Sequence, residues 1–157
     1  MPICETLIQI PSVKQNLRTM LDYPAIETHF SVCKTDNTLY TTKPEMGSPE
    51  MTGSHWLECD QPVVLIHSHP DKEFFSVHDI INPAQDKYEY VCLLNAPNRK
   101  LTCIDITTSE AQKYIRRTSK IFGKPVIRAE SRKQLLKLFS TAERQIKQLP
   151  EKCSIIV

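Results

Sequence analysis

The residues with the clearest chemical potential are two histidines and an aspartate within one short segment. His67 and His69 stand two positions apart and directly follow the apolar run Val63-Val64-Leu65-Ile66. Because side chains alternate between the two faces of a strand, both imidazoles point the same way. Asp79 follows after a loop that can return its carboxylate to them. Two histidines and one acid can hold a zinc ion and leave a fourth position for water, as catalytic zinc sites require.

The same segment contains Pro70 and Ser76, which gives the pattern His-x-His-Pro followed by Ser-x-x-Asp. This pattern closely resembles the signature of the JAMM (MPN+) zinc metalloproteases. The gap between His69 and Asp79 is one residue shorter than in many members of that family. The shortening falls before Ser76 and leaves the Ser-x-x-Asp spacing intact, so it concerns the shape of the loop rather than the set of ligands.

The resemblance implies a role for each of these residues. His67, His69 and Asp79 would hold one Zn²⁺ per chain. Ser76 would donate a hydrogen bond to the oxyanion of the tetrahedral intermediate. The expected activity is that of a zinc-dependent metalloprotease, which hydrolyses a peptide or isopeptide bond in a protein or peptide substrate such as a ubiquitin-like protein.

The family also uses a glutamate upstream of the histidines as general base. Glu27 begins a predicted strand directly after the first predicted helix, which is where the family places this residue. Glu58 and Glu50 remain the alternatives, because both lie in or near a long predicted loop over residues 43–61. That loop could also form a lid over the site.

Three other functional classes come into consideration for this motif, and they differ in whether they retain the zinc site. The segment Phe75-Ser-Val-His-Asp-Ile80 resembles part of the JAMM-like domains of secreted bacterial toxins, which would keep the metal site and change the substrate. A catalytically inert MPN scaffold would act as a protein-interaction module without metal, although every expected ligand type is present here. A zinc nucleobase deaminase is disfavoured, because its H-x-E and P-C-x-x-C motifs are absent.

The elements that must position these residues follow from periodicity and turn signals. Helical spacing after the capping-box pattern Ser12-x-x-Gln15 predicts a helix over residues 12–22. Residues 27–34 and 38–42 read as a hairpin around the turn Asp36-Asn37. The apolar run after Pro62 is typical of a strand that is buried on both faces of a sheet covered by helices.

The second half of the chain predicts a short helix beginning at Ser76, a hairpin over residues 88–94 and 101–106, and two final helices. Capping boxes at Thr107-x-x-Glu110 and Ser131-x-x-Gln134 start those helices, and Leu135, Leu138, Phe139, Ala142 and Ile146 form the apolar stripe of the last. The order indicates a single mixed α/β (α+β) domain over residues 1–157. The family resemblance implies a central mixed sheet flanked by helices, with cytidine-deaminase-like layering.

Composition restricts the partners and the location. The 157 residues include 20 basic and 18 acidic side chains, and this balance disfavours nucleic acid as a partner. No segment approaches the roughly 20 apolar residues of a membrane span, and no signal-peptide pattern is present, so a cytoplasmic location is expected, with secretion as an effector left open. The six cysteines include no C-x-x-C pair, which predicts buried thiols in a reducing compartment rather than disulfides. The oligomeric state is left open.

Overall fold

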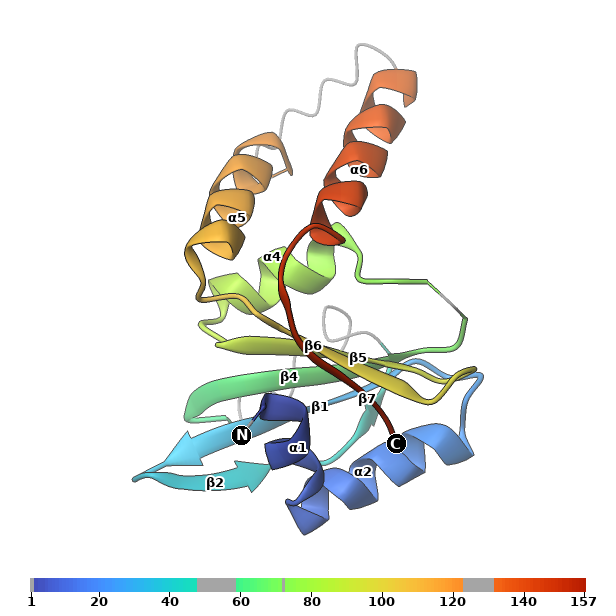
Figure 1. The fold of residues 1–157 in the computed structure, drawn as a ribbon, viewed down its shortest axis with the longest axis vertical. Helices are drawn as coiled ribbons and strands as arrows, with labels where there is room; N and C mark the ends of the chain where they lie inside the picture. Colours follow the sequence, from blue (N-terminus) through green and yellow to red (C-terminus); the bar gives the residue numbers. More distant parts are fainter. Residues whose placement is uncertain (1, 48–58, 72, 123–131) are drawn as a thin grey trace.

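The computed structural model describes residues 2–47, 59–71, 73–122 and 132–157, and a mixed β-sheet forms its centre (Figure 1). The strand order is β2-β1-β4-β5-β6-β7, and β3 pairs with β1. Strands β4 and β5 are parallel, while the other pairs are antiparallel. The strands are β1 (Thr28–Thr35), β2 (Thr38–Thr41), β3 (Glu45–Met46), β4 (Gln61–His69), β5 (Tyr90–Asn95), β6 (Lys100–Asp105) and β7 (Glu151–Ile156).

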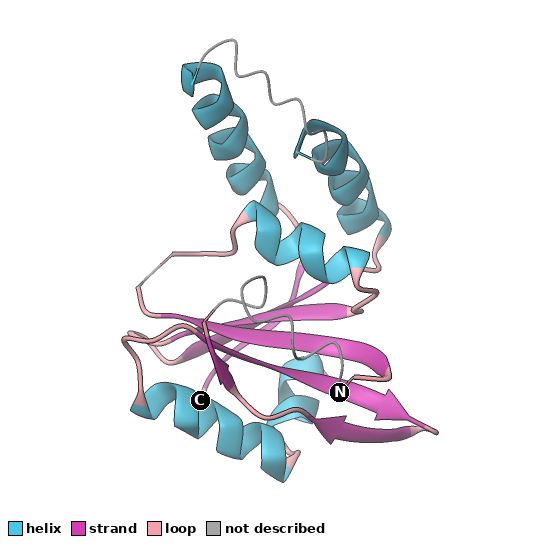
Figure 2. Cartoon of the chain, turned by 180° about the vertical axis from the view of Figure 1, so that it is seen from behind, coloured by secondary structure: helices cyan, strands magenta, loops and turns pink. Residues whose placement is uncertain are grey.

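Helices cover both faces of the sheet, as the sequence predicts (Figures 1 and 2). One face packs against α1 (Ile3–Ile8) and α2 (Pro11–Asp22), and Ile66 of β4 belongs to that cluster. The other face carries α4 (Val77–Gln85), α5 (Ser109–Phe122) and α6 (Arg132–Ile146), and Leu65 belongs to the second cluster. Neighbouring residues of β4 therefore enter opposite cores, which explains its continuous apolar run. The mixed α/β class is confirmed.

Helix α4 lies against the sheet, and α5 and α6 stand beyond it as a pair (Figure 1). The hydroxyl of Tyr114 on α5 donates a hydrogen bond of 3.1 Å to the carbonyl of Ala142 on α6. Both residues are buried, so this bond ties the two helices together where they meet α4. The pair of helices projects from the body on the side opposite α1 and α2 (Figures 1 and 2).

Three elements of the structure, α1, β7 and β3, are absent from the sequence prediction. Helix α1 has only 6 residues, too few for a helical period to be visible, and β7 follows Pro150 at the end of the chain. Strand β3 lies within the segment predicted as loop, and residues 48–58 of that segment lie outside the described residues.

The helix starts also differ from the prediction in detail. Helix α2 begins at Pro11 with Ile10 as its N-cap, so the predicted capping box at Ser12 does not form. Proline suits the first position of a helix because its missing N–H has no intrahelical partner there. In α5 the capping hydroxyl is that of Thr108, which accepts from the N–H of Ala111, rather than that of Thr107. Leu138 of α6 is 44% exposed, so its predicted place in the core is wrong.

All six cysteines form disulfides, which corrects the expectation of free thiols. The pairs are Cys4–Cys153, Cys33–Cys59 and Cys92–Cys103. Their sequence separations of 149, 26 and 11 residues follow no recognisable spacing, and Cys153 lies on β7, which was not predicted. Cys92 and Cys103 are opposite each other on β5 and β6, where antiparallel pairing alone brings two side chains together.

Within the described part of the chain, no helix has both the length and the apolar character needed to cross a bilayer.

Candidate metal centre

Strand β4 ends in the two histidines that the sequence analysis selected. His67 is 2% exposed and His69 is 9% exposed, and their rings lie edge to face with centroids 4.9 Å apart. Both point to the face of the sheet that carries α4. Leu65 belongs to the core on that face, and residues two and four positions after it in a strand share its face. The carbonyl of His69 accepts from the N–H of Ala96, which anchors the end of β4 to the residue that follows β5.

Asp79 reaches the histidines because of the way α4 begins. Ser76 is the N-cap of this helix, and the backbone N–H of Ser76 donates to Oδ2 of Asp79 at 2.7 Å. In return, Oγ of Ser76 accepts from the N–H of Asp79 at 3.4 Å. This reciprocal capping box holds the carboxylate in place. Its Oδ1 lies 3.3 Å from Nε2 of His67, and its Oδ2 lies 3.5 Å from Nε2 of His69.

Glu27 joins the site through the pairing of β1 with β4. His29 is opposite His67 in this antiparallel pair, and Glu27 lies two residues before His29, directly ahead of β1 rather than at its first position as predicted. Two hydrogen bonds fix the main chain around Glu27. The N–H of Thr28 donates to Oγ of Ser68, and the N–H of Gly47 donates to the carbonyl of Glu27. One possible ligand atom from each of Glu27, His67 and His69 lies within 4.8 Å of the other two.

The electrostatics of this cluster favour an ionised Asp79 beside the two imidazoles. Burial raises the pKa of Asp79, but the nearby imidazoles of His67 and His69 and the hydrogen bond from the Ser76 N–H outweigh it and hold this pKa well below its usual range. Burial lowers the pKa of His69, but the adjacent Asp79 carboxylate outweighs it and raises this pKa above its ordinary value. Asp79 is therefore ionised at neutral pH and available as a ligand.

The donor set fits a zinc ion. Nε2 of His67 is buried and makes no hydrogen bond to any described residue, although Asp79 lies near it. A buried polar atom without a partner is rare and needs an explanation, and a cation at this point supplies one. Nδ1 of His69 lies 3.2 Å from the carbonyl of Glu73; with its proton there, Nε2 keeps a lone pair directed at the cluster. Two imidazole nitrogens and one carboxylate are typical zinc ligands.

The structure adds two polar residues that the sequence analysis passed over. His29 is fully buried, and its Nδ1 lies 2.8 Å from the carbonyl of Gly47, while its Nε2 is 3.7 Å from Glu45. Asn95 of β5 is the register partner of His69, and its Oδ1 is buried without a hydrogen bond to any described residue. Strand alternation is the signal that could have found His29, because Glu27 and His29 share a face just as His67 and His69 do.

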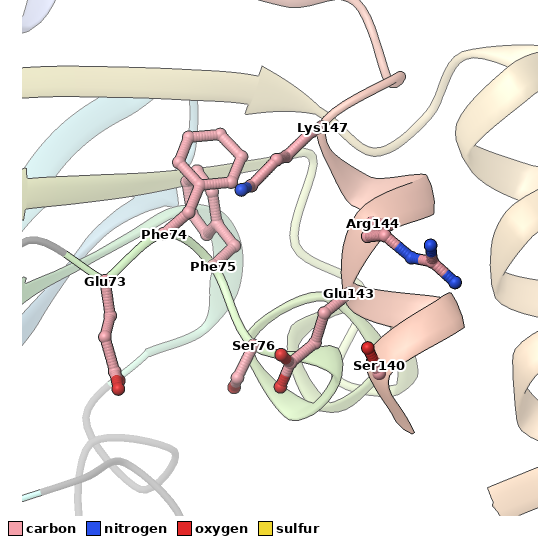
Figure 3. Close-up of a pocket in the computed structure, with 8 residues that line it drawn as sticks. All are labelled: Glu73, Phe74, Phe75, Ser76, Ser140, Glu143, Arg144 and Lys147. Atoms are coloured by element: carbon pink, nitrogen blue, oxygen red, sulfur yellow. The ribbon is translucent and has the colours of Figure 1, made fainter. Parts of the chain in front are cut away.

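A cavity of about 350 Å³ lies beside the loop that leads into α4 (Figure 3). Phe74, Ser76 and Glu73 line it from the loop, Glu143 lines it from α6, and Lys147 lines it from the turn that follows α6. Figure 3 shows the Glu143 carboxylate extending toward Ser76 and the Lys147 amine beside the ring of Phe74. The cavity therefore has an apolar wall and charges of both signs, and it begins at a residue of the capping box.

All five residues predicted for the site lie in the described part of the chain, and the structure brings them together. Glu50 and Glu58, the alternatives for the base, lie outside the described residues. Comparisons of this chain with family models, with curated proteins and with solved structures gave no match. The case for a function therefore rests on the residues and geometry of the site.

Proposed function

We propose that this protein is a zinc-dependent metallohydrolase of the JAMM type that cleaves a peptide or isopeptide bond. The observation that carries the proposal is the convergence of Asp79 and Glu27 on two buried histidines, one of which keeps an unbonded Nε2. A structural role for such a cluster would be costly, because burying polar groups without partners opposes folding. A metal-binding and catalytic role explains why the fold retains it.

The capping box supports Asp79, rather than Glu27, as the metal ligand. Asp79 is fixed by the N–H of Ser76 and lies within 3.5 Å of both imidazoles, so its position is that of a ligand. The Glu27 carboxylate forms no hydrogen bond or ion pair with any described residue, and its main chain alone is anchored. A side chain with that freedom can take up a proton and release it elsewhere, as a general base and acid must.

Zinc, when bound by His67, His69 and Asp79, supplies a Lewis acid that polarises a carbonyl and makes water more acidic. Glu27 accepts the proton of the attacking water and delivers it to the leaving amine. The hydroxyl of Ser76 only accepts in the capping box, so its own proton remains available for the oxyanion of the substrate.

The substrate that suits this surface is a protein or peptide. The cavity beside Ser76 offers an aromatic wall together with Glu73, Glu143, Arg144 and Lys147, which suits the mixed side chains of a polypeptide. A ubiquitin-like protein is one such substrate, and this choice follows the family resemblance rather than the cavity.

The disulfides support the second interpretation, a JAMM-like effector domain that works outside a reducing compartment. Disulfides persist in oxidising environments and are rare in the cytosol. Three of them in one chain therefore favour export over the cytoplasmic location that composition alone suggested. This interpretation keeps the metal site and the hydrolytic chemistry.

The test combines zinc content with hydrolysis of short peptide amides and of a fluorogenic C-terminal amide of a ubiquitin-like protein. Glu27→Gln should keep about one zinc per chain and lose about 10²- to 10⁴-fold in kcat, the usual contribution of a general base. His67→Ala should lose both zinc and activity. Glu89→Gln, at an exposed residue away from the site, is the matched control and should behave like the wild type.

Each role has its own contrary result. Hydrolysis that survives in Glu27→Gln would remove Glu27 from the role of base while leaving the metal site intact. Wild-type protein that takes up no zinc, even when zinc is added, would contradict the metallohydrolase and leave the scaffold interpretation in its place.

A further inference from the structure

The charges of this protein are strongly separated along the chain, although their sum is close to zero. Residues 109–147, which include α5 and α6, contain 11 of the 20 basic side chains and 3 of the 18 acidic ones, a net charge of +8. The remaining 9 basic and 15 acidic side chains give the rest of the chain a net charge of −6. The near-neutral total therefore conceals a basic helical pair on an acidic body.

Four of these cations form a row along the exposed side of α5. Lys113, Arg116, Arg117 and Lys120 are all exposed and line one depression of about 340 Å³. Their spacing places them on one face of the helix, opposite the buried Ala111 and Thr118. This row is called the α5 basic stripe below.

The α5 basic stripe has no compensating partner within the described residues. None of its four side chains forms an ion pair or a hydrogen bond there. Like charges three and four positions apart destabilise a helix, so the stripe opposes the folding of α5 unless an anion neutralises it. Such an arrangement is expected where a polyanionic ligand supplies the missing charge.

The chemistry of the stripe selects a phosphate backbone. Guanidinium groups bind phosphate through paired hydrogen bonds, and Arg116 and Arg117 provide two of them at consecutive positions of the stripe. The seven helical rises between Lys113 and Lys120 span about 10.5 Å. One strand of a duplex presents about three phosphates over that length, which matches the row of cations.

The side chains between the cations argue against other polyanions. Tyr114, the one aromatic residue between the cations, is buried and offers no exposed ring on which a single-stranded base could stack. Ile115, the one large apolar residue between them, packs against the core and is not free to enter a bilayer. On α6, however, Leu136 and Leu138 are exposed, so an anionic membrane is the alternative that the test must address.

We propose that the α5 basic stripe binds the sugar–phosphate backbone of double-stranded nucleic acid without reading its sequence. The contacts are those of phosphate with Lys and Arg, and exposed Lys133 and Lys137 of α6, with Lys147 directly after it, add charge to the same pair of helices. The proposal does not depend on the metal site, because none of these residues belongs to it.

The test is fluorescence anisotropy of a labelled 30-base-pair DNA duplex with the full chain, over a series of salt concentrations. The logarithm of the binding constant should fall linearly with the logarithm of salt concentration. Replacing all four residues of the stripe with Gln should weaken binding at least tenfold at low salt. It should also reduce the slope by about 3, since each phosphate contact contributes about 0.9.

A control variant removes the same number of charges elsewhere, with Lys14, Arg18, Lys87 and Lys100 replaced by Gln; all four are exposed and lie outside α5 and α6. This variant should bind the duplex within about twofold of the wild type, apart from the general effect of net charge. The melting temperature of the stripe variant should equal or exceed that of the wild type, because repulsion has been removed, which separates lost binding from misfolding.

Three results would overturn the proposal. The first is no binding of the duplex at low salt, and the second is an equal loss in the stripe and control variants. The third is binding to vesicles containing anionic lipid while the duplex is not bound, which would assign the basic helical pair to a membrane surface.

Discussion

Removing the Cys4–Cys153 disulfide should cost this protein more stability than removing either of the other two. A disulfide limits the conformations of the unfolded chain, and the effect grows with the length of the closed loop. The separations of 149, 26 and 11 residues correspond to about 5, about 3.5 and about 2.8 kcal/mol at 25 °C. Cys4–Cys153 joins α1 to β7, so it also holds the two ends of the described chain together.

The measurement is urea denaturation of the wild type and of three double Cys→Ala variants, each with and without a reductant. Alanine removes buried sulfur as well as the cross-link, and this packing loss is the same in both conditions, so it cancels in the difference. The reductant-sensitive part of the free energy of unfolding should fall most for Cys4→Ala/Cys153→Ala. The gap of about 2 kcal/mol from the Cys92→Ala/Cys103→Ala variant moves the urea midpoint by about 1 M at a typical dependence of about 2 kcal/mol per M.

A different order among the three variants would refute the argument from loop length. Wild-type stability that does not change on reduction would refute the disulfides themselves. It would also remove the support that they give to a location outside the cytoplasm, so this experiment bears on where the protein acts as well as on its folding.

Two further predictions concern buried polar groups. The first concerns His69 in protein freed of metal with a chelator: its raised pKa contributes stability that is complete below the unfolded value of 6.5 and is lost as pH rises through the folded pKa. The melting temperature should therefore fall as pH rises through that range, and the fall should be smaller in His69→Gln. Equal dependence of the melting temperature on pH in the two proteins would contradict this prediction. The second concerns Tyr88: Tyr88→Phe should lower the free energy of unfolding, measured with urea, by about 1 to 3 kcal/mol, because the buried Ser31 hydroxyl loses its partner at 2.6 Å. The double variant Ser31→Ala/Tyr88→Phe should lose less stability than the sum of the two single variants. Strict additivity would exclude the hydrogen bond.

The parts of the fold that the sequence predicts are those set by local patterns. The turn Asp36-Asn37 is predicted between two strands, and both residues have positive φ, of 48° and 66°, as a tight hairpin requires. The apolar run of β4 indicates a strand covered on both faces, and two separate cores do cover it. By contrast, β7 is short, and its pairing partner β6 lies about 50 residues earlier in the chain, so no local sequence pattern predicts this strand.

The sequence predicts the positions of site residues that lie within one strand or one helical turn. The His-x-His and Ser-x-x-Asp spacings lie within β4 and within the first turn of α4, so they translate directly into geometry. The approach of Glu27 depends on the register of β1 against β4, and the burial of Asn95 depends on its place beside His69 in β5. These are relations between distant segments, which a single sequence does not contain.

Overall composition is a poor guide to surface charge for a similar reason. A net charge of +2 disfavours nucleic acid as a partner, yet the cations are concentrated in the segment that forms α5 and α6. Charge acts through its local density, and exposed charges farther apart than about 10 Å are largely screened from one another at moderate salt. Charge counted separately for each helix and strand, rather than summed over the whole chain, reveals the basic pair of helices.

The pairing of Ser76 and Asp79 links the start of a helix to the proposed chemistry. Their three-residue spacing is that of a capping box, in which each side chain bonds the backbone of the other. Asp79 is thereby held by the helix itself, and its second oxygen stays directed at His67. The same geometry leaves the Ser76 proton unused, so one motif both positions a ligand and presents a hydrogen-bond donor beside it. The Ser-x-x-Asp pattern thus specifies structure and candidate function at once, and neither role could be altered without disturbing the other.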